Sequence, residues 1–123
     1  VVQKTNGQWV RGKGFDTFCP LGPFLVTPDE IPDIDRLTVW QRHNGELLQE
    51  GHTADMMFKI PFLIEYISQG MTLLPGDVIS TGTPSGIGSA REPKVLMAAG
   101  DVVEIGVNGL GEQRSPVMAM GKS

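Results

Sequence analysis

A chain of 123 residues is long enough for one small domain with a modest core. Its 40% hydrophobic and 20% charged residues are ordinary for a globular protein, and no apolar run approaches the ~18 residues of a membrane span. Fourteen acidic and ten basic residues give a net charge of −4, and the basic residues are scattered. The composition therefore argues against nucleic-acid binding, which requires clustered Lys and Arg.

Cys19 is the only cysteine, which excludes an internal disulfide and favours a reducing compartment, the cytoplasm or, in a eukaryote, the mitochondrial matrix. The first residues, VVQKTNGQWV, contain no initiator Met and resemble the interior of a longer protein, so we expect a fragment. The 16 glycines and 9 prolines are spread along the chain, which predicts short strands joined by tight turns.

The first third of the chain is predicted to be poor in regular structure. Residues 1–22 are rich in Gly and Pro and suggest an ordered loop anchored by Phe15 and Phe18. Residues 23–27 (PFLVT) suggest a short buried strand, and residues 28–35 (PDEIPDID) an acidic loop rich in turns.

The middle of the chain carries the clearest local patterns. Residues 37–50 predict a β-hairpin, because two alternating segments flank Asn44-Gly45, which suits a type I′ turn. Residues 53–70 predict the main helix, with Pro61 at a first helical position and Gly70 as a left-handed terminating residue.

In the last third, two Gly-Asp turns each precede an apolar segment, residues 77–83 and 101–107, which we expect to be strands. Asp77 and Asp101 are predicted to bond the backbone of their own turns. Asn108-Gly109 suggests a second hairpin, 101–107 with 110–118, and residues 84–99 suggest a long loop. With one main helix and roughly six strands, the predicted fold is mostly β, in the α+β class.

Common catalytic and metal-binding patterns are missing. No G-x-S-x-G motif or zinc-ligand spacing occurs, and Cys19 between Phe18 and Pro20 suggests a small buried side chain. His43 is predicted to lie in an exposed turn and His52 to cap or face solvent. The acidic group is interpreted as a solvated loop, because it lacks the spacing of a calcium loop: Asp29, Glu30, Asp33 and Asp35.

Two segments remain as candidates for binding. Residues 81–88 (TGTPSGIG) place hydroxyls and small residues after a predicted strand, where hydroxyls and backbone N–H groups can hold a carboxylate or phosphate. The alternative is a tight turn with structural glycines. Lys13 lies between two glycines, so it can approach a ligand without crowding, although an exposed loop lysine is equally compatible with the pattern.

Four motifs occur in the order seen in the fumarylacetoacetate hydrolase family: GKGFDTFCPLGPFLVTPDEIPD, NGELLQEGHTADMMF, TLLPGDVISTGTPSGIG and AAGDVVEIGVNGLG. Over residues 11–112 the chain resembles the shorter bacterial and domain-containing-protein-2-like members. The resemblance implies a mixed β-roll and sandwich fold, commonly dimeric, with residues 1–123 forming the C-terminal portion of one catalytic domain. It also implies a divalent cation, Mg²⁺ or else Mn²⁺ or Ca²⁺, that holds a 2-oxo-acid substrate.

The same resemblance implies roles for four residues. Lys13 matches a lysine that stabilises enolate or oxyanion charge. Thr83 matches a threonine that binds the substrate carboxylate, Gly82 is its backbone neighbour, and Thr17 matches a threonine near the cation or pocket in some members. Acylpyruvate, oxaloacetate and oxo-heptenedioate substrates share the head group that these residues would hold, so the hydrolase, decarboxylase and isomerase reactions stay open.

The family's metal ligands, a Glu-x-Glu pair and an Asp, belong to a segment upstream of Lys13 that this sequence lacks. We therefore expect no metal site in this chain alone, and either a homodimer or pairing with the missing N-terminal part. Two hypotheses remain: a fragment of a metal-dependent enzyme for 2-oxo acids, or a non-catalytic β-rich module that binds or dimerises.

Overall fold

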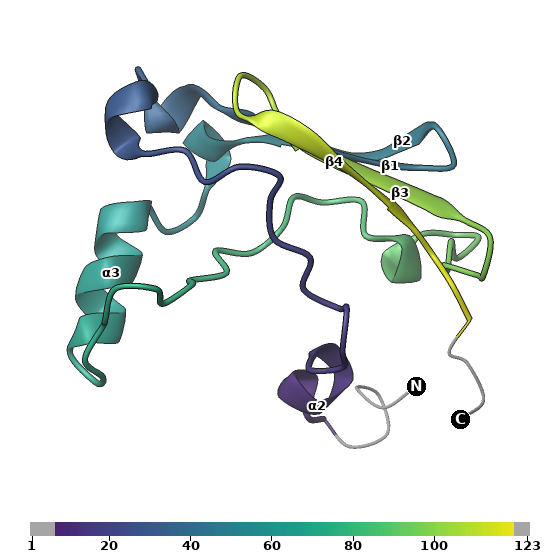
Figure 1. Cartoon of the computed structure of the whole chain (residues 1–123), viewed down its shortest axis with the longest axis horizontal. Coiled ribbons are helices and arrows are strands. Elements are labelled where there is room, and N and C mark those ends of the chain that lie inside the picture. Colours follow the sequence, from purple (N-terminus) through teal and green to yellow (C-terminus); the bar gives the residue numbers. More distant parts are fainter. Residues whose placement is uncertain (1–6, 120–123) are drawn as a thin grey trace.

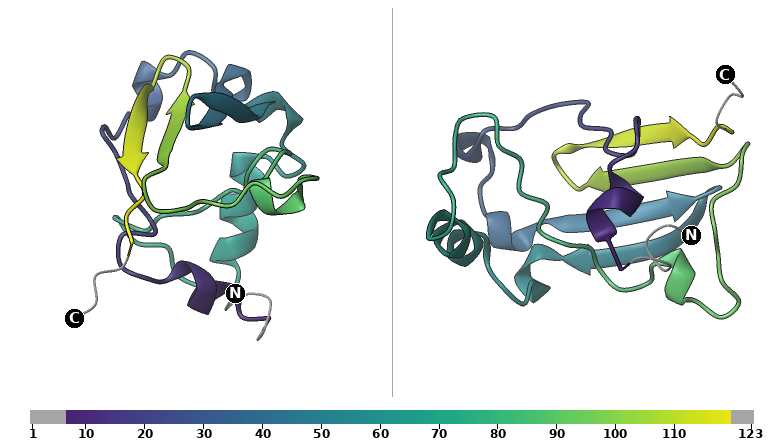
Figure 2. Two further views of the ribbon diagram at one scale, coloured as in Figure 1. Left: turned by 90° about the vertical axis from the view of Figure 1, so that its right-hand side faces the viewer. Right: turned by 90° about the horizontal axis from the view of Figure 1, so that it is seen from below.

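The computed structural model describes residues 7–119. A four-stranded antiparallel sheet forms one layer, and two long irregular segments and the helices lie against one of its faces (Figure 1). The strand order is β2-β1-β3-β4, as the second view in Figure 2 also shows. This arrangement confirms the predicted mostly β, α+β fold. The strands are β1 (Thr38–His43), β2 (Glu46–His52), β3 (Val102–Val107) and β4 (Gly111–Pro116).

Both predicted hairpins are present. Between β1 and β2, Asn44 has φ 51° and Gly45 has φ 84°, the two positive values that a type I′ turn requires. Between β3 and β4, Val107 pairs with Gly111, and the Leu110 N–H donates to the Val107 carbonyl at 2.9 Å. The central β1·β3 pairing joins the two hairpins into one sheet.

The main helix α3 runs over Ile60–Ser68, shorter than the predicted range of 53–70. A separate 3₁₀ turn occupies Thr53–Asp55, and Lys59 is extended at φ −72° and ψ 155°. Pro61 lies in the first turn of α3, where its missing N–H breaks no helical bond. The helix therefore begins just before this proline and cannot extend back to residue 53. Gly70 is not among the glycines with positive φ, so the predicted left-handed termination is wrong.

Two predicted strands are absent from the sheet. Residues 23–27 and 77–83 are irregular, and neither has a partner strand among the described residues. An apolar run forms a strand only where a neighbouring chain accepts its backbone hydrogen bonds. Conversely, a five-residue helix α2 (Trp9–Lys13) lies within the region predicted as loop. Three short 3₁₀ turns lie elsewhere, at Pro28–Glu30, Ile34–Arg36 and Gly88–Ala90.

The outer face of the sheet is organised around Trp40. Its ring covers Gly106 so closely that a Cβ there would lie 2.5 Å from a ring carbon. The indole N–H donates to Asn108 Oδ1 at 3.2 Å, and the Arg42 guanidinium lies 5.4 Å from the ring centroid. Because Gly106 carries no side chain, β1 and β3 can pair beneath this large ring.

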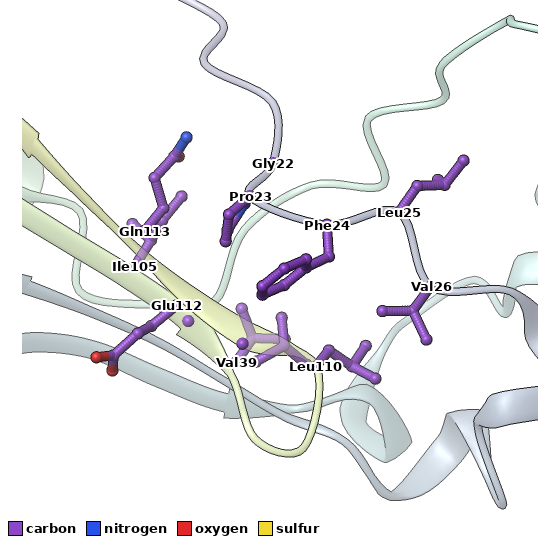
Figure 3. A pocket seen from close by; sticks show the side chains of 13 residues that line it. Gly22, Pro23, Phe24, Leu25, Val26, Val39, Ile105, Leu110, Glu112 and Gln113 are labelled. Atoms are coloured by element: carbon purple, nitrogen blue, oxygen red, sulfur yellow. The ribbon is translucent and has the colours of Figure 1, made fainter.

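The opposite face is apolar and holds a groove against the irregular segment 22–26. Figure 3 shows the Phe24 ring directed toward Val39 and Leu110, while Leu25 points away from the sheet. The groove remains open, since Phe24 is 72% exposed. Segment 22–26 thus packs on the sheet through side chains and not through backbone pairing.

Very little of the chain is buried. Among the described residues, Leu48 is the one apolar side chain that is buried. The solvent-accessible surface is 10136 Å², whereas a compact protein of this mass exposes about 6,500 Å². Phe15 and Phe18, predicted as anchors, contact each other with ring centroids 5.3 Å apart but are 46% and 59% exposed. Much of the apolar surface therefore has no cover within this structure.

No helix in the described part of the chain has the length and apolarity to cross a membrane.

Candidate functional site

The candidate substrate loop belongs to a stretch that we call the site segment, residues 78–91. Its small residues allow sharp changes of direction, with φ 105° at Gly82 and 98° at Gly86. Within residues 7–119, the structure shows no backbone–backbone hydrogen bond donated by residues 81–86. The loop thus leaves Thr83 exposed, and its N–H groups donate to no backbone carbonyl of the described residues; anion binding at this loop stays a prediction.

A buried glutamine attaches the site segment to the sheet. The Gln49 side-chain nitrogen lies 2.9 Å from Thr83 Oγ1 and 2.6 Å from the Pro84 carbonyl oxygen. Gln49 is 8% exposed, whereas Thr83 is exposed to solvent. A regular strand therefore fixes the position of a hydroxyl that belongs to an irregular loop.

A β-bulge creates the place where this attachment occurs. Gln41 pairs with Gln49 but Arg42 pairs with Leu47, so Leu48 is the extra residue of β2. The Arg91 guanidinium donates from Nη2 to the Leu48 carbonyl and from Nε to the Gly86 carbonyl at 3.0 Å. The bulge carbonyl thus faces the loop, and Arg91 links the two.

The contact between strand and loop is close enough to require glycine on both sides. A Cβ on Gly51 would lie 2.9 Å from the Pro84 ring, and a Cβ on Gly86 would overlap the Leu48 carbonyl oxygen. In Figure 2 the turn that follows the loop, Gly88–Ala90, lies beside β2, in agreement with these contacts. The site segment therefore contacts β2 at the bulge, where Arg91 satisfies the Leu48 carbonyl of this edge strand.

Sequence reasoning found Thr83 and Gly82 but missed Gln49 and Arg91. The family resemblance assigned no role to either side chain, and their partners lie 34 and 43 residues away in sequence. The polar Gln49 next to Leu48 in a strand was the available signal, because a polar residue at an inward position needs a hydrogen-bond partner.

Lys13 and Thr17 lie apart from these anchors. Lys13 is the last residue of α2, is exposed, and has its ammonium 5.4 Å from the centroid of the Trp9 ring. Within the described residues, no hydrogen bond joins Lys13 to Thr83. Thr17 is exposed and has φ 67°, an unusual value for a residue other than glycine. The described residues thus show no direct bond that joins Lys13 or Thr17 to Thr83 or Gln49.

Metal ligands do not converge in the part of the chain that the structure describes. Among residues 7–119, no group of three His, Cys, Asp or Glu side chains is placed to hold an ion. The predicted acidic loop is exposed: Asp33 accepts from the Asp35 N–H at 3.0 Å and pairs with Arg36 at 3.1 Å, and Asp35 pairs with Lys59 at 3.3 Å. A hard cation requires several converging oxygens, so the described residues do not by themselves fit one.

His43 was predicted to be solvated, and this is wrong. Its ring is buried, and Nε2 lies 2.8 Å from Asp101 Oδ2. Asp101 also accepts from the Asn44 amide at 2.9 Å and from the Ala98 N–H at 2.7 Å, the last being the predicted turn bond. The Asn44 amide, the Ala98 N–H and His43 together lower the pKa of Asp101 from 3.8 to about 2. The cluster joins the first hairpin turn to the start of β3.

The other predictions for single side chains have mixed outcomes. Asp77 accepts from the Leu74 N–H at 2.7 Å, the local turn bond that the sequence indicated. His52 is exposed and lies 3.1 Å from Thr38 Oγ1, in agreement with a surface position. Cys19 is exposed, so the prediction of a small buried side chain is wrong.

Comparison with known proteins identifies the relatives of this chain. The family model described as fumarylacetoacetate (FAA) hydrolase C-terminal matches residues 1–118. A curated relative from Burkholderia lata is 55% identical over 109 residues, which make up 88% of this chain and 39% of the relative. The chain thus spans about two fifths of the length of the curated relatives that it matches.

Solved structures show the same conformation within longer chains. A fumarylacetoacetate hydrolase from psychrophilic Exiguobacterium antarcticum is 42% identical, with a TM-score of 0.92 over 96% of this chain and 42% of that one. A 5-carboxymethyl-2-hydroxymuconate delta-isomerase from Mycobacterium smegmatis is 43% identical, with a TM-score of 0.86 over 98% and 44%. A maleylpyruvate hydrolase from Sphingobium sp. SYK-6, solved with manganese(II) and pyruvate, is 38% identical, with a TM-score of 0.77 over 85% and 37%.

Proposed function

Because the chain belongs to the fumarylacetoacetate hydrolase family, we propose that it supplies the carboxylate-binding part of an enzyme for 2-oxo acids. Neighbours in this family include hydrolases and isomerases, two of which are named for maleylpyruvate and 5-carboxymethyl-2-hydroxymuconate. The observation that carries the proposal is the placement of Thr83, an exposed hydroxyl held on the sheet edge by Gln49. The reaction would be hydrolysis, decarboxylation or isomerisation of an acylpyruvate, oxaloacetate or oxo-heptenedioate type of substrate.

In this proposal Thr83 and the backbone at Gly82 bind the substrate carboxylate. The hydroxyl donates one hydrogen bond to a carboxylate oxygen, and the unpaired N–H groups of the loop favour the same negative charge. Because the carboxylate does not react, these contacts are equally strong before and during the reaction. They contribute to substrate affinity more than to the rate of the chemical step.

Lys13 has a different proposed role, in which its ammonium stabilises the negative charge that develops on an enolate or oxyanion. Its exposed position and the absence of a salt bridge within the described residues leave the ammonium available for such a charge. Thr17 is proposed to line the same pocket. A Lys13→Ala change would lower kcat more than it raises KM, because the interaction strengthens in the transition state.

A divalent cation, Mg²⁺ or else Mn²⁺ or Ca²⁺, is the proposed cofactor of the complete domain, as manganese(II) is present in one solved neighbour. The described residues hold no converging set of ligands, so the proposal places those ligands outside residues 7–119 and assigns no step to the ion here. Unpaired Cys19 suits the reducing conditions of the cytoplasm, or of the mitochondrial matrix in a eukaryote, which is the proposed location.

The uncovered apolar surface supports a second part to the proposal, that a polypeptide equivalent to the remainder of the relatives packs against this chain. The surface exceeds that of a compact protein by about 3,600 Å², which is the scale of obligate interfaces. Light scattering of the chain mixed with the N-terminal part of a relative tests this. A 1:1 complex supports it, whereas a stable dimer of the chain alone points to a second copy as the occupant.

Titration with pyruvate tests the carboxylate site directly, with backbone amide shifts in ¹⁵N NMR spectra as the readout. We expect saturable shifts centred on the site segment and a dissociation constant raised on the order of tenfold by Thr83→Val. Thr81→Val is the matched control, because it removes a hydroxyl from the same loop that has no contact with Gln49. Equal effects of the two changes, or no saturable shifts, would contradict the proposed site.

A further inference from the structure

The Gln49 amide determines which atoms of Thr83 remain free. The Pro84 carbonyl oxygen can only accept a hydrogen bond, so the group 2.6 Å from it must be the NH₂ of Gln49 and not its oxygen. The same nitrogen lies 2.9 Å from Thr83 Oγ1. An NH₂ group carries two hydrogens and no acceptor, so the Thr83 oxygen accepts one of them.

This assignment fixes the polarity of the Thr83 hydroxyl. Because its oxygen already accepts from Gln49, its own proton is directed elsewhere, and the exposed side of Thr83 is toward solvent. A hydroxyl in this state has its proton free to donate to an approaching ligand. Carboxylate oxygens only accept, so the arrangement favours them, and a charged acceptor makes the stronger bond.

The Gln49 side chain is held firmly in place, so it can keep the Thr83 hydroxyl in one orientation. Gln49 is 8% exposed and lies on β2 in register with Gln41. One residue before it, the Leu48 carbonyl is held by Arg91, which also holds the Gly86 carbonyl. The loop is therefore held on both sides of Ser85: Gln49 binds the Pro84 carbonyl directly, and Arg91 links the Gly86 carbonyl to Leu48.

We propose that Gln49 is a positioning residue that keeps the Thr83 hydroxyl in the donor state required for a substrate carboxylate. The proposal rests on the carboxylate-binding function argued above and adds to it a residue that does not touch the substrate. Arg91 maintains the shape of the loop, whereas Gln49 sets the direction of the Thr83 proton.

Gln49→Glu is the decisive variant, because it preserves size and reverses the hydrogen bonding. An ionised Glu side chain has no hydrogen to donate, so the Thr83 hydroxyl would turn its proton inward and lose its donor role toward the ligand. We expect the dissociation constant for pyruvate at pH 7.5 to rise on the order of tenfold or more. Affinity should recover as the pH falls and the Glu carboxyl regains a proton that it can donate.

Gln41→Glu is the matched control, since Gln41 faces Gln49 across the sheet and has no bond to Thr83. It introduces the same charge nearby, so it should leave affinity close to that of the parent chain with no recovery at low pH. An equal loss of pyruvate affinity in both variants would mean that charge repulsion alone causes it, and would overturn the proposal. An unchanged dissociation constant in Gln49→Glu would overturn it as well.

A measurement without ligand separates this inference from the proposed function. The side-chain NH₂ resonances of Gln49 should be protected from exchange in the parent chain, and one should lose protection in Thr83→Val. If that protection is absent, the positioning role is wrong, whatever binds. If protection is present but pyruvate does not bind, the proposed function fails and the donor role fails with it. If pyruvate binds and only Thr83→Val weakens it, the function stands without Gln49.

Discussion

The sheet and the site segment are held in place by different kinds of interaction. In the sheet, each strand is fixed by a ladder of backbone hydrogen bonds, either to its hairpin partner or, for β1 and β3, also to each other. The site segment has no ladder and is attached to β2 by two side chains: Gln49 of β2 reaches Thr83, 34 residues away, and Arg91 of the segment reaches the Leu48 carbonyl, 43 residues away. The regular part of this structure is therefore a support, and the irregular part carries the proposed binding loop.

This difference has a consequence for stability and for function. Many small bonds support the sheet, so one lost polar contact there changes little. The site segment rests on a few contacts, and removing one changes the geometry of Thr83. Variants that damage one region and spare the other make this comparison testable.

The largest effect is expected in the sheet, from Leu48→Ala. Leu48 is 6% exposed at the bulge, and truncating a buried leucine costs about 2–5 kcal/mol of unfolding free energy. Leu47→Ala is the control, because its neighbouring side chain is 45% exposed and should cost less than about 1 kcal/mol. Urea unfolding followed by circular dichroism measures both. Similar losses would show that the bulge residue is not a core residue.

A smaller effect is expected in the site segment, from Gly86→Ala. A residue with a side chain is strained at φ 98°, at a cost of about 1–3 kcal/mol, and its Cβ would also displace the Leu48 carbonyl. Gly82→Ala has a similar φ of 105° but nothing within 4 Å, so it isolates the strain. Gly86→Ala should also perturb the Arg91 Nε–H resonance in NMR spectra, whereas Gly82→Ala should not. If both variants leave that resonance unchanged, the loop is not held to the strand as described.

The smallest effect at neutral pH concerns the cluster around Asp101 and is best seen in acid. The pKa of Asp101 is lowered to about 2 in the folded chain, so its contribution is present above pH ~4 and is lost as the pH falls through 2. Asp101→Asn should reduce this loss, measured as the urea midpoint at pH 5, 3 and 2. Asp77→Asn removes a turn bond to Leu74 without a histidine partner and should keep the parent acid dependence. Identical curves for the parent chain and both variants would show that the contacts of Asp101 with His43 and Asn44 do not contribute to the acid dependence of stability.

Local sequence determined the parts of this protein whose partners are near in the chain. Asn44-Gly45 fixed the first hairpin, Pro61 fixed the start of α3, and the two Gly-Asp turns make their bonds to residues three positions away. Residues 81–88 also stood out by their hydroxyls and small residues, and the family resemblance singled out Thr83 among them. Each of these features depends on backbone preferences that a few neighbouring residues impose.

Tertiary structure alone decided which apolar segments became strands, which polar side chains were buried and which residues hold the loop. Segments 23–27 and 77–83 have the composition of strands but no described partner to pair with, and His43 is buried only because Asp101 arrives from 58 residues away. Gln49 became an anchor because a bulge and a distant loop meet at the edge of β2. Burial and hydrogen bonding at these positions depend on which distant groups the fold brings together, and short-range patterns carry no record of those contacts.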